Sequence, residues 1–205
     1  MKLFFSPPSS DDLIRLLKAW RFWLVGALVG AVIGAAVYSI VPPPYRARAT
    51  VNVDFHIEQA WPKDTDRQQF YYLERETRKL EEIAWSDEVL NTAAAQVADN
   101  SFMADSGKLQ LGQPGNGGWH FYADDRDPKK AAAFASAWAQ AFAAKVKADV
   151  ATSSSGLEQY ITADATQTQK ITAYRSVSMS IYLLAGSLVF LAVCVLGILF
   201  FDLKK

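Results

Sequence analysis

The sequence has few of the residues that build metal and redox sites. It holds one cysteine and two histidines in 205 residues. The lone Cys194 can form neither an internal disulfide nor a multi-cysteine metal site. His56 and His120 fall on the polar side of expected strands, where a surface role is favoured, although the two could face each other across a sheet. We therefore expect neither a metal nor a cofactor.

The chain also lacks an excess of charge of either sign. Its 21 basic residues balance its 21 acidic ones, so there is no electrostatic case for nucleic-acid binding. No glycine-rich loop runs into Lys-Ser or Lys-Thr, as nucleotide phosphates would require. Asp124, Asp125 and Asp127 could bind a cation, but they precede an expected helix, where capping is favoured. With no nucleophile-base arrangement evident, we predict that the protein is not an enzyme.

Charged residues are missing from two long stretches, one near each end. Residues 22–41 are 20 residues without a charge, and 26 more lie between Arg175 and Asp202. Twenty helical residues span about 30 Å, the thickness of a bilayer's hydrocarbon core. Residues 22–41 and 177–201 are therefore predicted to be transmembrane helices. Three prolines, Pro42 to Pro44, follow the first stretch in place of a cleavage site, so we expect a retained anchor.

Basic residues at both ends predict the orientation. The tails, residues 1–21 and 202–205, carry Lys2, Arg15, Lys18, Arg21, Lys204 and Lys205. Basic residues beside a membrane span mark the cytoplasmic side. Arg46, Arg48 and Arg175, on the loop side of the two spans, favour the opposite orientation, but the rule applies poorly to a loop this long. We expect a bacterial inner-membrane protein with both termini cytoplasmic and its central domain periplasmic or extracytoplasmic.

Small residues line one face of the first stretch. Gly26, Gly30 and Gly34 recur every four residues. This spacing lets two helix backbones approach closely in lipid, which supplies no hydrophobic force to join them. The three glycines are therefore predicted to form a helix-packing or oligomerisation face. Its partner could be the second helix, a neighbouring copy or another protein.

The segment between the two stretches alternates strand and helix patterns. Residues 51–57 and 119–123 show period two, 109–111 suggest a short strand, and residues 70–84, 86–98 and 127–146 show helical stripes. We expect an α+β domain over residues 42–150, with helices on one face of a small mixed sheet. Residues 151–176 are predicted to be a helical return to the membrane, with a bend or break at Gly156.

This layout resembles the Wzz-type chain-length determinants, or polysaccharide co-polymerases. The resemblance rests on Pro43-Pro44-Tyr45-Arg46-Ala47 after the first span, on Ser86 to Leu90, and on Asp125 to Ala132. It implies a homo-oligomeric ring of two-span subunits with periplasmic α/β bases. Such rings help a membrane polymerase to set polysaccharide length, or couple synthesis to export, and the family has no catalytic residues.

The sequence departs from that family in two places. About 25 residues are available for the long helical arm that normally projects before the return to the membrane. The family's proline-rich step before the second span is replaced by Tyr174 to Ser178. We therefore expect a non-catalytic scaffold for polysaccharide chain-length control or export. An accessory subunit of another membrane complex, or a membrane-anchored binding module acting alone, remains the alternative.

Overall fold

A computed structural model describes residues 14, 17–56, 59, 66–98, 101–113, 118–152, 160–165 and 171–201. The chain divides into two compact units. The first, called the helix pair here, comprises Met1–Pro43 and Val177–Lys205. The second, called the domain, is Pro44–Ser176.

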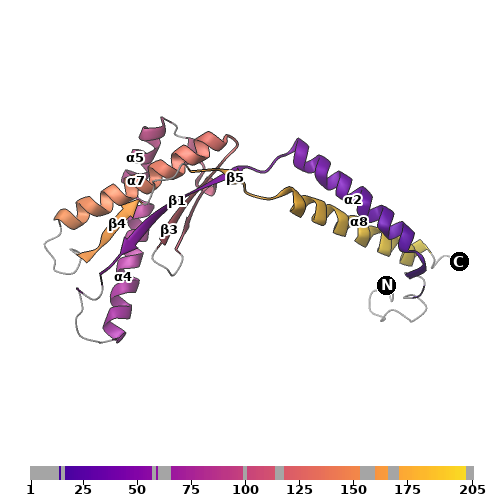
Figure 1. Cartoon of the computed structure of the whole chain (residues 1–205), viewed down its shortest axis with the longest axis horizontal. Helices are drawn as coiled ribbons and strands as arrows, with labels where there is room; N and C mark the ends of the chain where they lie inside the picture. The colour runs from indigo at the N-terminus through magenta and orange to yellow at the C-terminus, as the bar shows by residue number, and fades with distance from the viewer. Residues whose placement is uncertain are drawn as a thin grey trace. The chain divides into compact units, whose positions relative to one another are not determined.

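The helix pair contains α2 (Trp20–Ile40) and α8 (Met179–Phe201), which pack on each other (Figure 1). Helical segments Trp20–Ile40 and Met179–Ile198 are each long and apolar enough to cross a membrane. Both predicted helices are therefore present, with ends that differ by a few residues from the expected ones. Most large apolar side chains of α2 and α8 are exposed, which suits a lipid environment and not water.

The domain is built on one antiparallel sheet. Its strands are β1 (Tyr45–Asp54), β2 (Leu109–Gly112), β3 (Gly118–Asp125), β4 (Thr162–Ala165) and β5 (Tyr174–Arg175). They are arranged β2-β3-β1-β4, and β5 pairs with the beginning of β1. The predicted mixed sheet is wrong, because every described pairing is antiparallel. β3 and β4 run in the same direction, but β1 lies between them, so no parallel pair forms.

Helices cover one face of this sheet. They are α4 (Asp66–Ala84), α5 (Asp87–Val97), α6 (Ser101–Ala104), the short 3₁₀ helix η2 (Ser106–Lys108) and α7 (Pro128–Thr152). Helix α7 packs on β1, β3 and β4, while α4 and α5 pack on α7 (Figure 1). Alternate residues of β1, from Ala47 to Val53, are buried beneath α7, and the residues between them lie on the other, open face. The α+β class with helices on one face is confirmed.

The core between sheet and helices is aromatic and centres on Trp138 of α7. Its ring lies 4.9 Å from the rings of both Phe121 and Trp85, measured between centroids. Its indole Nε1 donates a hydrogen bond of 2.8 Å to the carbonyl of Ala84, the last residue of α4. Because a buried indole N–H needs a partner, this bond fixes where α4 ends against α7.

The predicted helix over the return segment is wrong at the residues that the structure describes. Residues 162–165 form β4, which pairs with β1 from Val51 to Asp54, and residues 174–175 form β5. The domain therefore extends to Ser176 and does not end at residue 150. The helix is expected because residues 157–174 are polar and include good helix formers, but Ala163 is fully buried against the sheet, and tertiary pairing outweighs local propensity. Gly156, the expected bend, lies outside the described residues.

The first helix after β1 is rotated from its predicted stripe. The apolar stripe of residues 70–84 in the sequence predicts Phe70 and Thr77 on the inner face of α4 with Leu80 and Ala84, yet Phe70 is 64% exposed. Tyr72 and Glu76 take the inner positions, with Leu80 and Ala84 as predicted. The predicted cap of α5 is confirmed, because the Ser86 hydroxyl accepts a hydrogen bond from the amide of Val89.

Candidate functional site

The glycine face of α2 lies against α8. Gly26, Gly30 and Gly34 are the buried residues of α2. A Cβ added at Gly30 would overlap the Gly186 carbonyl, and one added at Gly34 would overlap the carbonyl of Tyr182. Gly186 is the counterpart on α8, since its own Cβ would meet the Gly30 carbonyl. The backbones of the two helices thus touch, and any side chain at these positions would force them apart.

Polar and aromatic contacts extend this helix-helix contact along its length. The Ser187 hydroxyl of α8 donates a hydrogen bond of 3.1 Å to the carbonyl of Ala27 on α2. Further along, Tyr38 and Tyr182 meet edge to face with ring centroids 5.3 Å apart. Of the three partners left open by the sequence, the structure presents α8 of the same chain. Oligomerisation through these glycines stays a prediction.

The two ends of the domain are fastened to each other. Tyr45 and Arg46 of β1 pair with Arg175 and Tyr174 of β5, and the Ser176 amide donates a hydrogen bond of 2.9 Å to the carbonyl of Pro44. The Arg175 guanidinium also lies 4.2 Å from the Tyr45 ring centroid, a close cation–π contact. Both chain connections to the helix pair therefore leave from one place, which we call the connection end of the domain.

An ion pair joins two strands on the open face of the sheet, within the connection end. The Arg46 guanidinium binds Asp124 of β3 in two-pronged geometry, through Nε at 2.8 Å and Nη2 at 2.7 Å. The hydrogen bonds to Asp124 raise the pKa of Arg46 above its usual value. This contact corrects the role expected for Asp124, which pairs across the sheet and does not cap the following helix.

Asp125 and Asp127, the other two aspartates expected to cap the helix, do stabilise the N-terminus of α7. The Asp127 carboxylate accepts a hydrogen bond of 2.8 Å from the Lys129 amide, as an N-cap does. The Asp125 carboxylate accepts another of 2.8 Å from the Asp127 amide and so fixes the turn. Among the described residues, no three His, Cys, Asp or Glu side chains lie close enough to hold a metal ion.

The two histidines lie in separate places. His120 Nδ1 is 3.0 Å from the Thr50 hydroxyl, at a position where those two residues face each other across β1 and β3. His56 Nε2 is 3.2 Å from the Thr162 hydroxyl, beyond the opposite end of β1. They do not meet across the sheet. Partial burial, and secondarily the charge of Arg48, lower the pKa of His120 below its ordinary value of 6.5.

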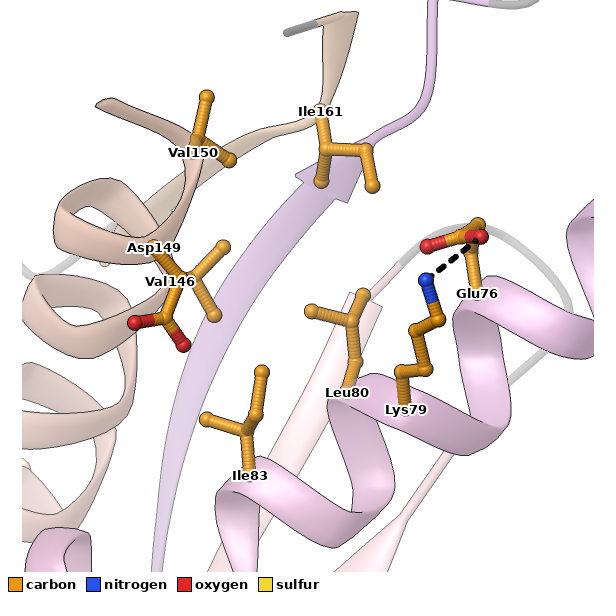
Figure 2. Close-up of a pocket in the computed structure, with 8 residues that line it drawn as sticks. All are labelled: Glu76, Lys79, Leu80, Ile83, Val146, Asp149, Val150 and Ile161. Carbon is orange, nitrogen blue, oxygen red and sulfur yellow. Dashed lines mark ion pairs between the residues drawn. The ribbon is translucent and has the colours of Figure 1, made fainter. Parts of the chain in front are cut away.

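The one buried carboxylate of the described residues borders a groove. Glu76 is 2% exposed and contacts Arg75 Nη2 at 2.8 Å and Lys79 Nζ at 3.3 Å. Figure 2 shows the pair with Lys79. The groove, of about 270 Å³, is lined otherwise mainly by aliphatic side chains of α4, α7 and the residue before β4. Because two cations already neutralise Glu76, we assign it a structural role and no proton-transfer role. The helical stripe of residues 70–84 leaves Glu76 among the polar residues, so neither that stripe nor a recognisable motif signals this residue in the sequence.

No protein-family model matches the chain, and no curated protein matches its sequence.

Proposed function

We propose that this chain is a non-catalytic scaffold subunit of a bacterial inner membrane. In this proposal α2 and α8 span the bilayer, both termini are cytoplasmic, and the domain is periplasmic. Several copies assemble and assist a membrane polymerase in chain-length control, or in export, of a cell-surface polysaccharide. The class of protein is that of the polysaccharide co-polymerases, which the sequence resembles.

The observation that carries the proposal is the closure of the domain at its connection end. β5 pairs with the first two residues of β1, and Ser176 bonds to Pro44. A domain whose entry and exit are tied together suits two spans that place it on one side of a membrane. The order strand, two helices, strand hairpin and long helix agrees with the α/β base that the resemblance implies.

One feature favours the alternative of an accessory subunit in another membrane complex. Helix α7 ends at Thr152 and β4 begins at Thr162, so only nine residues separate the two. The long projecting arm of the co-polymerases has no room there. A subunit that keeps the base and lacks the arm suits a supporting role, in which length control belongs to another protein.

Deletion of the gene in its native host separates these two candidates. The scaffold proposal predicts a changed length distribution of a surface polysaccharide on gels, restored by the full-length chain. A second complementation uses the chain with Gly197→Leu as the control. Nothing lies within 4 Å of a side chain added at Gly197, so this variant should restore the pattern as fully as the unchanged chain does. An unchanged distribution, together with loss of another membrane complex on native gels, would favour the accessory subunit instead.

A further inference from the structure

The connection end of the domain differs in charge from the remainder of it. Residues 45–48, 122–130 and 174–176 meet there through the β1–β3 and β1–β5 pairings and the start of α7. They contain six basic residues and three acidic ones. Residues 42–175 as a whole carry 15 basic and 18 acidic residues, which leaves nine basic and fifteen acidic for the rest. The connection end therefore has a net charge of +3 and the rest −6.

Several of these cations are available to an outside partner. The bidentate pair with Asp124 occupies Arg46, but Arg48, Arg126 and Lys129 are exposed. No ion pair to a carboxylate is found for these three among the described residues. Arg48 belongs to β1, Arg126 to the turn after β3 and Lys129 to the first turn of α7. The exposed cations of the connection end therefore come from three different elements.

Tyrosines accompany the cations. Tyr45 and Tyr122 are half-buried and Tyr174 is 54% exposed, all three within the connection end. The Arg46 guanidinium lies 5.7 Å from the Tyr122 ring centroid. Tyrosine rings with arginine and lysine nearby form the side-chain chemistry enriched at the headgroup level of bilayers.

Covalent geometry keeps this surface close to the ends of the membrane helices. Four residues separate Ile40 of α2 from Tyr45, and three separate Arg175 from Met179 of α8. Fully extended, such connections reach roughly 15 Å, and the attraction of a cation to an acidic bilayer surface falls off over about 8–10 Å. Connections this short allow the cations to come within that range of the bilayer surface.

We propose that the connection end of the domain binds the headgroups of acidic phospholipids in the membrane that α2 and α8 cross. The inference rests on the two-span part of the proposed function and on nothing about polysaccharide. Arg48, Arg126, Lys129 and Arg175 supply the charge, and the three tyrosines supply the interfacial contact. The remainder of the domain has a net negative charge, so this charge separation would orient the domain on an acidic bilayer.

The test uses the full-length chain taken up in mixed vesicles of equal phosphatidylglycerol and phosphatidylcholine. The protein is solubilised, and the ratio of the two retained lipids is measured by mass spectrometry at 50 and 500 mM NaCl. We expect enrichment of phosphatidylglycerol at low salt that weakens at high salt. Removing one cation should reduce this enrichment by up to roughly fivefold.

The decisive variants each remove one arginine and one lysine. Arg48→Gln with Lys129→Gln lowers the net charge of the connection end from +3 to +1, whereas Arg78→Gln with Lys147→Gln removes the same charge from exposed positions of α4 and α7 elsewhere. The first pair should lose most of the enrichment and the second should keep it. Equal enrichment in both variants, or equal loss, would overturn the proposal. Far-ultraviolet circular dichroism verifies that both variants are folded.

The outcome is separable from that of the proposed function. Resistance of the chain to carbonate extraction tests directly whether the chain is embedded in the membrane. A chain that resists extraction and enriches phosphatidylglycerol, but leaves polysaccharide length unchanged on deletion, would sustain this inference and defeat the scaffold proposal.

Discussion

The helix pair and the domain are packed by opposite means. In the helix pair the contact surface is made of glycines, so that the backbones of α2 and α8 touch. In the domain the contact surface is made of large rings, with Phe102 stacked on Phe134 at 4.2 Å and Trp119 on Phe142 at 5.5 Å. Water drives burial of large apolar surface, whereas in lipid only close approach and hydrogen bonds favour association. The difference is the one expected between a unit that packs in lipid and one that packs in water.

The largest expected effect is on the aromatic side of that comparison. Trp138→Ala removes a fully buried ring and its hydrogen bond to Ala84, and should destabilise the domain by about 3–5 kcal/mol. Urea unfolding of the full chain in detergent, followed by circular dichroism, measures this. Phe70→Ala, at a side chain 64% exposed, is the control and should change stability by less than about 0.5 kcal/mol. Similar losses in both variants would mean that Trp138 is not the centre of the core.

The second prediction concerns the glycine contact between α2 and α8, which should be weakened by adding a side chain. Gly30→Leu places a side chain where the Gly186 carbonyl lies, so α2 and α8 must separate, at a cost of about 1–3 kcal/mol. The rings of Tyr38 and Tyr182 are in contact, so Tyr38→Cys and Tyr182→Cys provide a pair of cysteines for cross-linking α2 to α8. The cross-linking yield should fall by more than half when Gly30→Leu is added. Cys194→Ser is introduced first to remove the native thiol. Gly197→Leu, which meets nothing within 4 Å, should leave the cross-linking yield unchanged, and the urea midpoint of the domain should not move in either variant.

A smaller effect is expected at the ion pair of the open face. Arg46→Gln leaves Asp124 without its bidentate partner, at an expected cost of about 1 kcal/mol, because both side chains are partly exposed to water. The double variant Arg46→Gln with Asp124→Asn should cost no more than Arg46→Gln alone. A double-mutant cycle of urea midpoints gives the coupling energy directly. A coupling near zero would show that solvent screens the pair completely.

The smallest effect concerns pH. Burial lowers the pKa of His120 below 6.5, so the unfolded chain takes up a proton first as pH falls. This contribution to stability is present above pH 6.5 and is lost as pH falls through the lowered value. We expect the drop in urea midpoint between pH 7.5 and pH 5 to be smaller in His120→Gln than in wild type. An identical drop in the two proteins would refute the assignment.

Much of this comparison could be predicted from the sequence. The charge-free stretches give the two helices, the four-residue glycine spacing gives the close face of α2, and period two gives β1 and β3. These signals are local and strongly periodic. Gly186 gave no such signal, because a single small residue in a bulky helix acquires meaning only when the opposing Gly30 is placed beside it.

The parts that could not be predicted depend on contacts between distant segments. β4 and β5 are four and two residues long, too short to show a period, and exist because β1 offers its free edge. The pairing of Asp124 with Arg46 follows from sheet register, whereas in sequence Asp124 looks like one more residue before a helix. Glu76 sits inside because Arg75 and Lys79 neutralise it, and a hydrophobic stripe cannot reveal that.

The most direct test of the account is the mass and shape of the full-length protein in detergent, by light scattering and electron-microscope class averages. A scaffold of the proposed kind should give a closed ring of several copies, in which α2 and α8 remain cross-linkable within each chain. A monomer, or a single copy held within a larger unrelated complex, would contradict ring-based assembly and leave the accessory subunit as the account of this protein.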